Sequence, residues 1–482
     1  MRSMPGVRAV LKVGDDAVAV VADTWWQAKR GLDALPITWD EGAGVSVSSA
    51  TIEAMLDEGL SSSKGVFVGH RRGNAKKALK RAPTKIEAVY RFPYQHHATM
   101  EPMNATALWT KERCEVWCPT QNGEAALKAA AEASGLPIEQ CDVHKLDPGG
   151  GFGRRGAFHD FVEQAVGIAK QLPGTPVKLL WSREEDMAHG HYHPITKAKL
   201  EGGLSQDGKI VGLRVRISGQ SIRAAVSPDS LAKDGSDAIV FQGLAPEGDH
   251  AISYSMPNLL VEHAMRNPPV PPGFWRGVNI NQNIVYLECF LDELAHAAKR
   301  DPLELRRELM AEHPKSRAVL DAVAERVGWT TPPASGLHRG LSVAKAFGSY
   351  VAACAEVSVS AGGSLTIERI VAATDPGHAV NPQQIEAQVE GSFVFGLSAL
   401  LYGECTIRGG AVEQSNFHDY PSMRLREMPK VEVIVMPSGG FWGGIGEPTI
   451  AVAAPAVLNA IFAATGKRAR ELPLKNADLR PA

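Results

Sequence analysis

The chain has 482 residues, with 51 Lys and Arg residues against 53 Asp and Glu residues, which gives a formal net charge of −2. A chain with so little net charge lacks a large single-sign field, so we expect neither a nucleic-acid partner nor binding to an anionic membrane. Hydrophobic residues make up 44% and charged residues 22% of the sequence, which is typical of a folded globular protein rather than a disordered one.

Turn-forming residues are frequent, with 47 Gly and 31 Pro, and they favour a site built from loops over a helix bundle. The 6 cysteines lack the paired spacing of a disulfide scaffold, a zinc site or an iron–sulfur site. We therefore expect no metal ligands among them and place most of them in the core. No apolar run is long enough to span a bilayer, and residues 1–6 are unlike a secretory signal. From the chain alone, a cytoplasmic location is expected.

The N-terminal region predicts an incomplete domain followed by a connector. The expected elements are strands at residues 7–13, 17–22 and 36–40 and a short helix at about 25–32. Residues 41–81 are rich in Ser, Gly and Lys and predict an exposed connector with a modest helix at 51–60.

The middle and C-terminal regions mix strands and helices. We expect strands at 105–110 and 114–118, a helix at about 123–134 closed by Gly135, a strand–glycine loop–helix–strand unit over 143–181, a hairpin over 197–219, and helices from about 283 and from Pro302. After a break at residues 330–340, strands at 351–360, 365–374 and 431–436 precede a helix that ends at Gly466. The order predicts an α+β protein.

The first glycine loop (residues 149–156) contains Gly151, Gly153 and Gly156 in the spacing G-x-G-x-x-G, between a predicted strand and helix and with Glu184 after the next strand. This spacing is typical of a dinucleotide-binding turn. Only one such unit is visible, so a nicotinamide dehydrogenase stays a minority hypothesis. The alternatives are backbone N–H groups that bind an anionic ligand, or a tight turn without a ligand.

The second glycine loop (residues 439–448) leads into an apolar helix and places Glu447 beside aromatic residues. Apolar surroundings raise the pKa of a carboxyl group and a helix N-terminus lowers it, so Glu447 is a candidate general base. The structural alternative is that Glu447 only caps the helix.

Three further features have both a functional and a structural interpretation. Arg276, bracketed by apolar residues, suits an anion or a carbonyl, or else a structural salt bridge. Gln121 precedes a helix and suits a ligand hydrogen bond, although helix capping also explains its neighbours. The triplet His189-x-His191-x-His193 has the alternation of metal ligands in a strand. Because no carboxylate accompanies it, we interpret it as solvated surface histidines.

Several long motifs resemble one family. They are CPTQN (118–122), GGGFGRRGAFHDFVEQAVGIAKQ (149–171), PVKLLWSREEDM (176–187), NPPVPPGFWRGVNINQNIVYLECFLDELA (267–295), HAVNPQQIEAQVEGSFVFGLSALLYGE (378–404), QSNFHDYPSMR (414–424) and GIGEPTIAVAAPAVLNAIFAATGK (444–467). Together they resemble the large molybdopterin-binding subunit of the molybdenum hydroxylases, in the branch of the isoquinoline 1-oxidoreductase beta subunit and its aldehyde-oxidising relatives. The resemblance covers nearly the whole chain in the expected order.

The resemblance implies a role for each matching residue. Glu447 corresponds to the base that generates an oxygen nucleophile at the molybdenum centre for attack on an electron-poor carbon. Gln121 would donate a hydrogen bond to the oxo ligand, with Gly151, Phe152 and Gly153 packed on the same side. Arg276 would lie near the substrate or the pterin, and Gln388, Gly391 and Gly446 would line the cofactor cleft. The implied cofactor is a molybdenum-bound molybdopterin cytosine dinucleotide, and the implied partner is a small [2Fe-2S] subunit.

Two departures from the family pattern affect the expectations. The family's usual N-terminal segment and its G-Q-G motif are not found, so residues 1–45 correspond to the C-terminal part of a hammerhead-like domain. A connector (46–85) and two molybdopterin-binding domains (86–332 and 333–482) follow. Arg154-Arg155-Gly156 replaces the acidic residue of the xanthine-oxidising branch, which disfavours a purine substrate.

Three hypotheses follow. The first is an oxidoreductase subunit that hydroxylates N-heteroaromatic compounds or oxidises aldehydes. We expect it to be the product of a truncated gene, a fragment, or a split subunit whose other part is a separate polypeptide, with export to the periplasm if a signal-bearing segment accompanies it. The second is a non-catalytic remnant or assembly partner of such an enzyme. The third is an NAD(P)-dependent dehydrogenase built on the first glycine loop.

Overall fold

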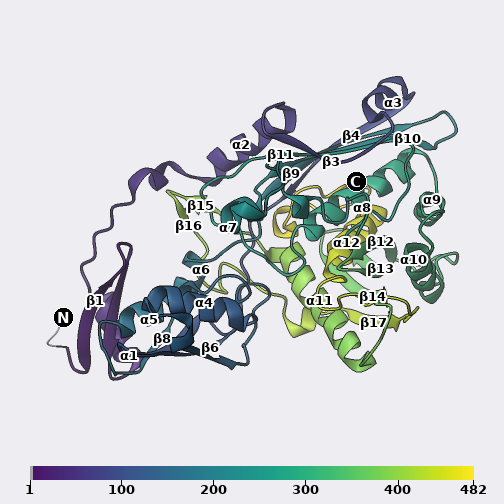
Figure 1. The fold of residues 1–482 in the computed structure, drawn as a ribbon. Coiled ribbons are helices and arrows are strands. Elements are labelled where there is room, and N and C mark those ends of the chain that lie inside the picture. Colours follow the sequence, from purple (N-terminus) through teal and green to yellow (C-terminus); the bar gives the residue numbers. More distant parts are fainter. Residues whose placement is uncertain (1–3, 482) are drawn as a thin grey trace.

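The computed structural model describes residues 4–481 and has two lobes (Figure 1). The smaller lobe, at the lower left of the view, combines the N-terminal hairpin with a four-stranded sheet and its helices. Its elements are β1 (Val7–Val13), β2 (Ala17–Ala22), α1 (Trp25–Asp33), β5 (Asn104–Trp109), β6 (Cys114–Pro119), α4 (Gly123–Ser134), β7 (Cys141–Leu146), α5 (Asp160–Ala169) and β8 (Val177–Leu180). The structure confirms the helix that was predicted to end at Gly135. This residue is the C-cap of α4 and has a φ of 74°.

The small-lobe sheet has the order β7-β6-β5-β8. β6 and β7 are parallel, whereas β5 is antiparallel to both β6 and β8. α5 packs on this sheet because its apolar residues recur at helical spacing, and Phe161, Val162 and Ala165 are fully buried. β7 and β8 therefore lie at opposite edges, and the first glycine loop with α5 connects them across the sheet.

The larger lobe begins with a five-stranded sheet of order β3-β11-β10-β9-β4. Its strands are β3 (Val66–Arg72), β4 (Thr84–Phe92), β9 (Thr196–Leu204), β10 (Ile210–Gly219) and β11 (Leu259–Met265). The predicted hairpin over 197–219 is confirmed as β9 and β10, which turn at Gly208 with a φ of 75°. Two helices, α2 (Ser49–Ser61) and α3 (Ala75–Arg81), pack on β10 (Figure 1).

Two secondary-structure predictions for the N-terminal region were wrong. Residues 36–40 form no strand, because PITWD has no neighbouring strand with which to pair. Residues 46–85 hold the predicted helix but are not merely an exposed connector, because β3 pairs with β11 and α3 covers the sheet. Their Ser- and Lys-rich composition reflects solvent-facing positions on ordered elements. The residue boundaries of the domains stay a prediction.

The second sheet of the larger lobe has the order β12-β13-β14-β17. It consists of β12 (His338–Ala346), β13 (Ser349–Val359), β14 (Leu365–Asp375) and β17 (Lys430–Val435), and the helices around it are α8 (Ile280–Ala297), α9 (Pro302–Leu309), α10 (Pro314–Val327), α11 (Pro382–Tyr402) and α12 (Ile450–Thr465). Because Gly340 has no side chain, α12 lies directly on β12: a Cβ there would be 2.2 Å from the Ala460 nitrogen. The buried positions of α8 and α12 join both sheets in one core.

The remaining short elements are α6 (Arg183–Ala188), α7 (Ile222–Val226), β15 (Ile407–Arg408) and β16 (Ala411–Val412). The predicted end of α12 at Gly466 is confirmed by its φ of 72°. All 6 cysteines are free and buried, as predicted. None of the helices described here combines the length and the apolarity that crossing a bilayer requires. The mixture of helices and sheets confirms the α+β expectation.

Candidate active site

Glu447 lies at the end of the second glycine loop, just before α12. Its Oε1 accepts a hydrogen bond of 2.9 Å from the backbone N–H of Gly277. The N-cap of α12 is Thr449, and no side chain caps the helix, so Glu447 is not a capping residue. Burial raises the pKa of the Glu447 carboxyl group, while the Gly277 N–H and the nearby Arg276 guanidinium act in the opposite direction. The site thus holds a desolvated carboxylate with a second oxygen to spare.

The Arg276 guanidinium connects the second glycine loop to α11. Its Nε donates to the Gly446 carbonyl at 2.6 Å, and its Nη2 donates to the Ser392 hydroxyl at 2.9 Å and to Gln388 Oε1 at 3.1 Å. Within the described residues, no carboxylate lies within ion-pair distance of Arg276, so the salt-bridge interpretation does not hold. Burial lowers the pKa of the Arg276 guanidinium. A guanidinium surrounded by neutral acceptors leaves a local positive charge in the site.

Two glycines, Gly391 and Gly446, lie beside Arg276 and Gln388. A Cβ at Gly391 would find Arg276 Nη1 as its nearest atom, at 3.9 Å, and a Cβ at Gly446 would find only Gln388 Oε1, at 4.0 Å. Gln388, Gly391 and Ser392 follow the helical spacing of α11, which puts them on one face. The predicted residues Arg276, Gln388, Gly391, Gly446 and Glu447 therefore share one site with open space along its backbone.

The turn formed by residues 274–278 holds this site in place. Its backbone is constrained: Val278 has a φ of 53° and its N–H donates to the Trp275 carbonyl at 2.6 Å. Two buried side chains fix the turn, since Asn281 Nδ2 donates to the Arg276 carbonyl at 2.8 Å and His193 Nε2 lies 3.1 Å from the Val278 carbonyl. These two contacts hold the turn so that the Gly277 N–H points towards Glu447.

The first glycine loop packs against the same turn. The Gly153 N–H donates to Gln121 Oε1 at 3.0 Å, so the Gln121 amide nitrogen is the group left to donate to a ligand. Gly153 has a φ of 106°, and a Cβ there would lie 1.5 Å from the Phe274 carbonyl oxygen. A Cβ on Gly151 would lie 2.3 Å from Gln121 Oε1. Close backbone approach explains both glycines.

An aromatic stack joins the two glycine loops. Phe152, with a φ of 52°, stacks on Phe395 at a ring-centroid distance of 4.2 Å, and Phe395 stacks on Trp275 at 4.4 Å. Trp275 directly precedes Arg276 in the 274–278 turn. The structure thus brings all nine predicted site residues around this turn, although they come from five separate segments of the chain.

Arg154 and Arg155 anchor the first glycine loop rather than lining the site. Both side chains are fully buried. Arg154 Nη2 donates to both carboxylate oxygens of Asp160, and Arg155 Nη2 donates to the carbonyls of Glu101 and Pro102. Because these guanidinium groups point into the protein, they make no contact that could select a substrate directly.

The geometry opposes the dinucleotide-binding interpretation of the first glycine loop. α5 begins at Asp160, four residues after Gly156, so the loop does not end at a helix N-terminus, and the Gly153 N–H is already bonded to Gln121. The flanking strands lie at opposite edges of the sheet, and Glu184 accepts a hydrogen bond from Asn416. These features do not match the turn that binds a nicotinamide cofactor.

The histidine triplet also differs from its prediction. Only His189 is largely exposed, whereas His191 stacks on Phe158 at 3.7 Å and His193 is fully buried behind the 274–278 turn. Burial lowers the pKa of His193 to about 4, so it is neutral at physiological pH. No cluster of metal-ligating side chains occurs between residues 4 and 481, as far as these are described.

Sequence reasoning missed Ser392, Gly277 and Phe395. Ser392 lies four residues after Gln388 on α11, so helical spacing could have revealed it. Gly277 and Phe395 act through a backbone N–H and a ring stack between distant segments. Such contacts leave no local signal in the sequence.

Family comparisons agree with this geometry. The profile of the molybdopterin cofactor-binding domain family matches residues 61–310, and a second profile with the same description matches residues 292–429. The chain belongs to this family of molybdopterin-binding proteins and is a molybdenum hydroxylase large-subunit homologue.

Two curated relatives match almost the whole chain. The isoquinoline 1-oxidoreductase subunit beta of Brevundimonas diminuta is 27% identical over 500 residues, which cover 99% of this chain and 62% of the relative. The membrane-bound aldehyde dehydrogenase [pyrroloquinoline-quinone] of Gluconacetobacter polyoxogenes is 27% identical over 489 residues, which cover 96% of this chain and 62% of that protein. The chain thus spans about three fifths of the length of these relatives.

A solved structure supports the fold. Quinoline 2-oxidoreductase from Pseudomonas putida 86 superimposes with a TM-score of 0.78 at 13% identity, over 98% of this chain and 90% of that one. At this identity the comparison establishes the shared architecture.

Proposed function

We propose that the chain is the cofactor-binding catalytic part of a molybdenum-dependent oxidoreductase that hydroxylates N-heteroaromatic compounds or oxidises aldehydes. The observation that carries the proposal is Glu447, a desolvated carboxylate held by Gly277 next to Arg276. The names of the isoquinoline and aldehyde relatives supply the two substrate classes.

The residues of the site fit a molybdenum-bound molybdopterin, for which we propose the cytosine dinucleotide form. Gln121 offers a free amide donor to an oxo ligand, and Arg276 offers positive charge to an anionic group. Gly391 and Gly446 leave their backbone uncovered by a side chain next to Arg276 and Gln388. When bound, the cofactor would supply the two-electron oxidation.

Proton transfer is the task of Glu447. Its Oε1 accepts the Gly277 N–H, so the other oxygen, Oε2, is the atom that would take a proton from the oxygen nucleophile. Burial raises the pKa of Glu447 and makes it a stronger base than an exposed carboxylate, while the Arg276 guanidinium acts in the opposite direction and favours the ionised form. Phe152, Phe395 and Trp275 form an apolar stack beside Arg276.

The partners follow from the same proposal. We propose a small [2Fe-2S] subunit as the partner that would take up the electrons, because one relative is by name the beta subunit of a larger enzyme. The compartment that we propose is the cytoplasm, or the periplasm if the enzyme is exported.

Molybdenum and cytosine nucleotide content test the proposal. We expect near-stoichiometric amounts after co-expression with the neighbouring genes, or in the chain purified alone. The alternative is a remnant or assembly partner without catalysis. Absence of both molybdenum and cytosine nucleotide from every preparation, with the chain folded, would favour that candidate.

Gln121→Glu separates the two functions of the Gln121 side chain. The new carboxylate keeps an acceptor for the Gly153 N–H but has no amide donor. We expect an unchanged melting temperature and a loss of roughly 10- to 100-fold in turnover or in molybdenum retention. Turnover and molybdenum content equal to those of the wild type would contradict the role of the amide as a ligand donor.

A further inference from the structure

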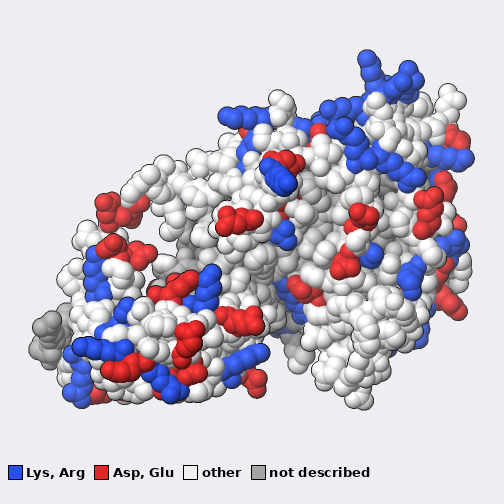
Figure 2. All heavy atoms as spheres, viewed as in Figure 1, with Lys and Arg blue, Asp and Glu red and all other residues white. Residues whose placement is uncertain are grey.

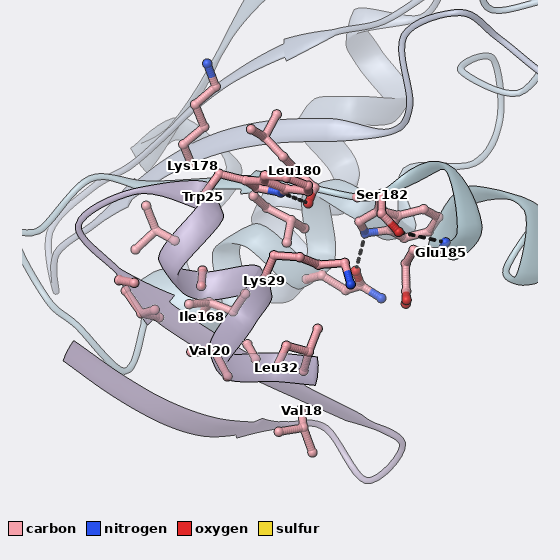
Figure 3. Close-up of a pocket in the computed structure, with 18 of the residues that line it drawn as sticks. Val18, Val20, Trp25, Lys29, Leu32, Ile168, Lys178, Leu180, Ser182 and Glu185 are labelled. Carbon is pink, nitrogen blue, oxygen red and sulfur yellow. Dashed lines mark hydrogen bonds between the residues drawn. The ribbon is translucent and has the colours of Figure 1, made fainter. Parts of the chain in front are cut away.

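A cavity in the small lobe shares no lining residue with the candidate site. It has a volume of about 640 Å³ and is lined by all of β2 and β8, by α1, and by Gln164 and Ile168 of α5. Figure 3 shows Val18 and Val20 of β2 near one side and Lys178 and Leu180 of β8 near the other. Neither glycine loop contributes to it, so the cavity needs an explanation of its own.

The two strands that border the cavity each have one unpaired edge. β2 pairs only with β1, and β8 pairs only with β5. Among the described residues, the single hydrogen bond at these outer edges runs from Trp25 Nε1 to the Leu180 carbonyl, at 3.1 Å. Unpaired backbone N–H and C=O groups on two strands that line one cavity are donors and acceptors for a further strand.

Helices pack on both sides of the cavity, as they would pack on the two faces of a sheet. Leu11, Val13, Ala19 and Val21 of the hairpin pack against the core that contains α5. Val20 points the other way, towards α1, where it lies against Gly31. α5 also packs on β8. The hairpin and the four-stranded sheet thus share α5 on one face, with α1 covering the opposite face of the hairpin.

The composition of β2 differs from that of an ordinary exposed edge strand. Its sequence AVAVVA is apolar on both faces, and all six residues are half-buried. Leu180, at the end of β8, is 37% exposed. Natural edge strands are usually protected by charges, proline or bulges. β2 has no charge and no proline over Ala17–Ala22, and the register shift in its pairing with β1 lies only at the end of the pair, between Val7 and Ala9. A strand that is apolar on both faces is typical of the interior of a sheet.

We propose that this cavity is a strand-binding slot, which takes one extended segment of polypeptide from outside residues 1–482 and joins β1-β2 to β8-β5-β6-β7 in a continuous sheet. The apolar lining selects a segment with alternating apolar side chains, and the free edges bind its backbone. The relatives carry such additional polypeptide, because the match covers 62% of their length. The slot is independent of the chemistry proposed for Glu447.

The probe for this slot is a fluorescent peptide of seven alternating Val and Thr residues between lysines, tested on the full chain by anisotropy. We expect saturable binding, and slower amide hydrogen exchange at Ala17–Ala22 and Val177–Leu180 in the presence of the peptide. The control is the same peptide with alternate backbone amides N-methylated, which keeps the apolar surface but cannot complete a ladder. Its binding should be at least about tenfold weaker.

Two variants locate the binding. Leu180→Lys places a charge in the slot and should weaken peptide binding about tenfold or more, whereas Val68→Lys, on the half-exposed edge strand β3 of the other sheet, should have no effect. Exchange protection in the wild type provides a readout that does not depend on the folding of either variant. Equal binding of the N-methylated peptide, no binding of either peptide, or protection by self-association alone would overturn the proposal.

Discussion

Glu447→Gln should lower turnover by roughly 10²–10⁴-fold, the range typical for loss of a general base, while molybdenum content stays at the wild-type level. The amide is nearly isosteric with the carboxylate, and its oxygen can still accept the Gly277 N–H. The change therefore removes the proton acceptor without removing the contact that orients the side chain. Metal analysis and steady-state kinetics on the same preparation measure both quantities.

The pH dependence of the wild type should report the same group. Burial raises the pKa of Glu447, and only the deprotonated carboxylate can accept a proton, so kcat/KM should fall as the pH drops through a value above the ordinary 4.5 of a glutamate. Residual activity of Glu447→Gln should lack this acid limb. As a matched control, Glu325→Gln removes an exposed carboxylate on α10 and should change neither turnover nor the profile. An unchanged acid limb in Glu447→Gln would contradict the assignment.

Gly153→Ala should cost roughly 2–6 kcal/mol of unfolding free energy, because strain at a positive φ and overpacking each contribute about 1–3 kcal/mol. The added Cβ would lie 1.5 Å from the Phe274 carbonyl oxygen, which belongs to the turn that carries Arg276. Relief of this clash requires the first glycine loop to move away from the 274–278 turn. We therefore expect a loss of molybdenum retention together with the lower stability, measured by denaturant unfolding and metal analysis.

Gly123→Ala is the matched control for this substitution. Gly123 is the first residue of α4, close in sequence to Gln121, and a Cβ there would meet no atom within 4 Å. Alanine at such a position removes conformational freedom from the unfolded chain, so stability should be unchanged or rise by about 0.4–1 kcal/mol. Similar losses of stability in both variants would show that the clash with Phe274 is not the cause.

The parts of the fold with a strong local signal were predictable from sequence. The end of α4 at Gly135, the turn at Gly208 and the end of α12 at Gly466 each depend on residues adjacent in the chain. The role of β3 was not predictable, because its edge pairing with β11 depends on residues about 190 positions away. The same reason applies to residues 36–40. Their composition is strand-like, but no neighbouring strand is available for pairing, so they form no strand.

The motifs predicted which residues make up the candidate site, but they did not predict its geometry. The resemblance singled out Glu447 and Arg276, but only the structure revealed that Glu447 bonds Gly277 instead of capping α12. Arg276 likewise meets carbonyl, amide and hydroxyl oxygens rather than the carboxylate of a salt bridge. His193 alternates with its neighbouring histidines as metal ligands in a strand would. It is buried, however, and its ring supports the 274–278 turn.

The Arg276–Gly446 and Gly277–Glu447 hydrogen bonds each join residues 170 positions apart. Closing a loop of this length costs conformational entropy, which must be lost before the contact is rewarded. We therefore expect the site to be among the last parts of the protein to form during folding. On the proposed function, cofactor insertion would then follow the folding of the segments that carry Arg276 and Glu447, and an N-terminal fragment without Glu447 would not hold the complete site.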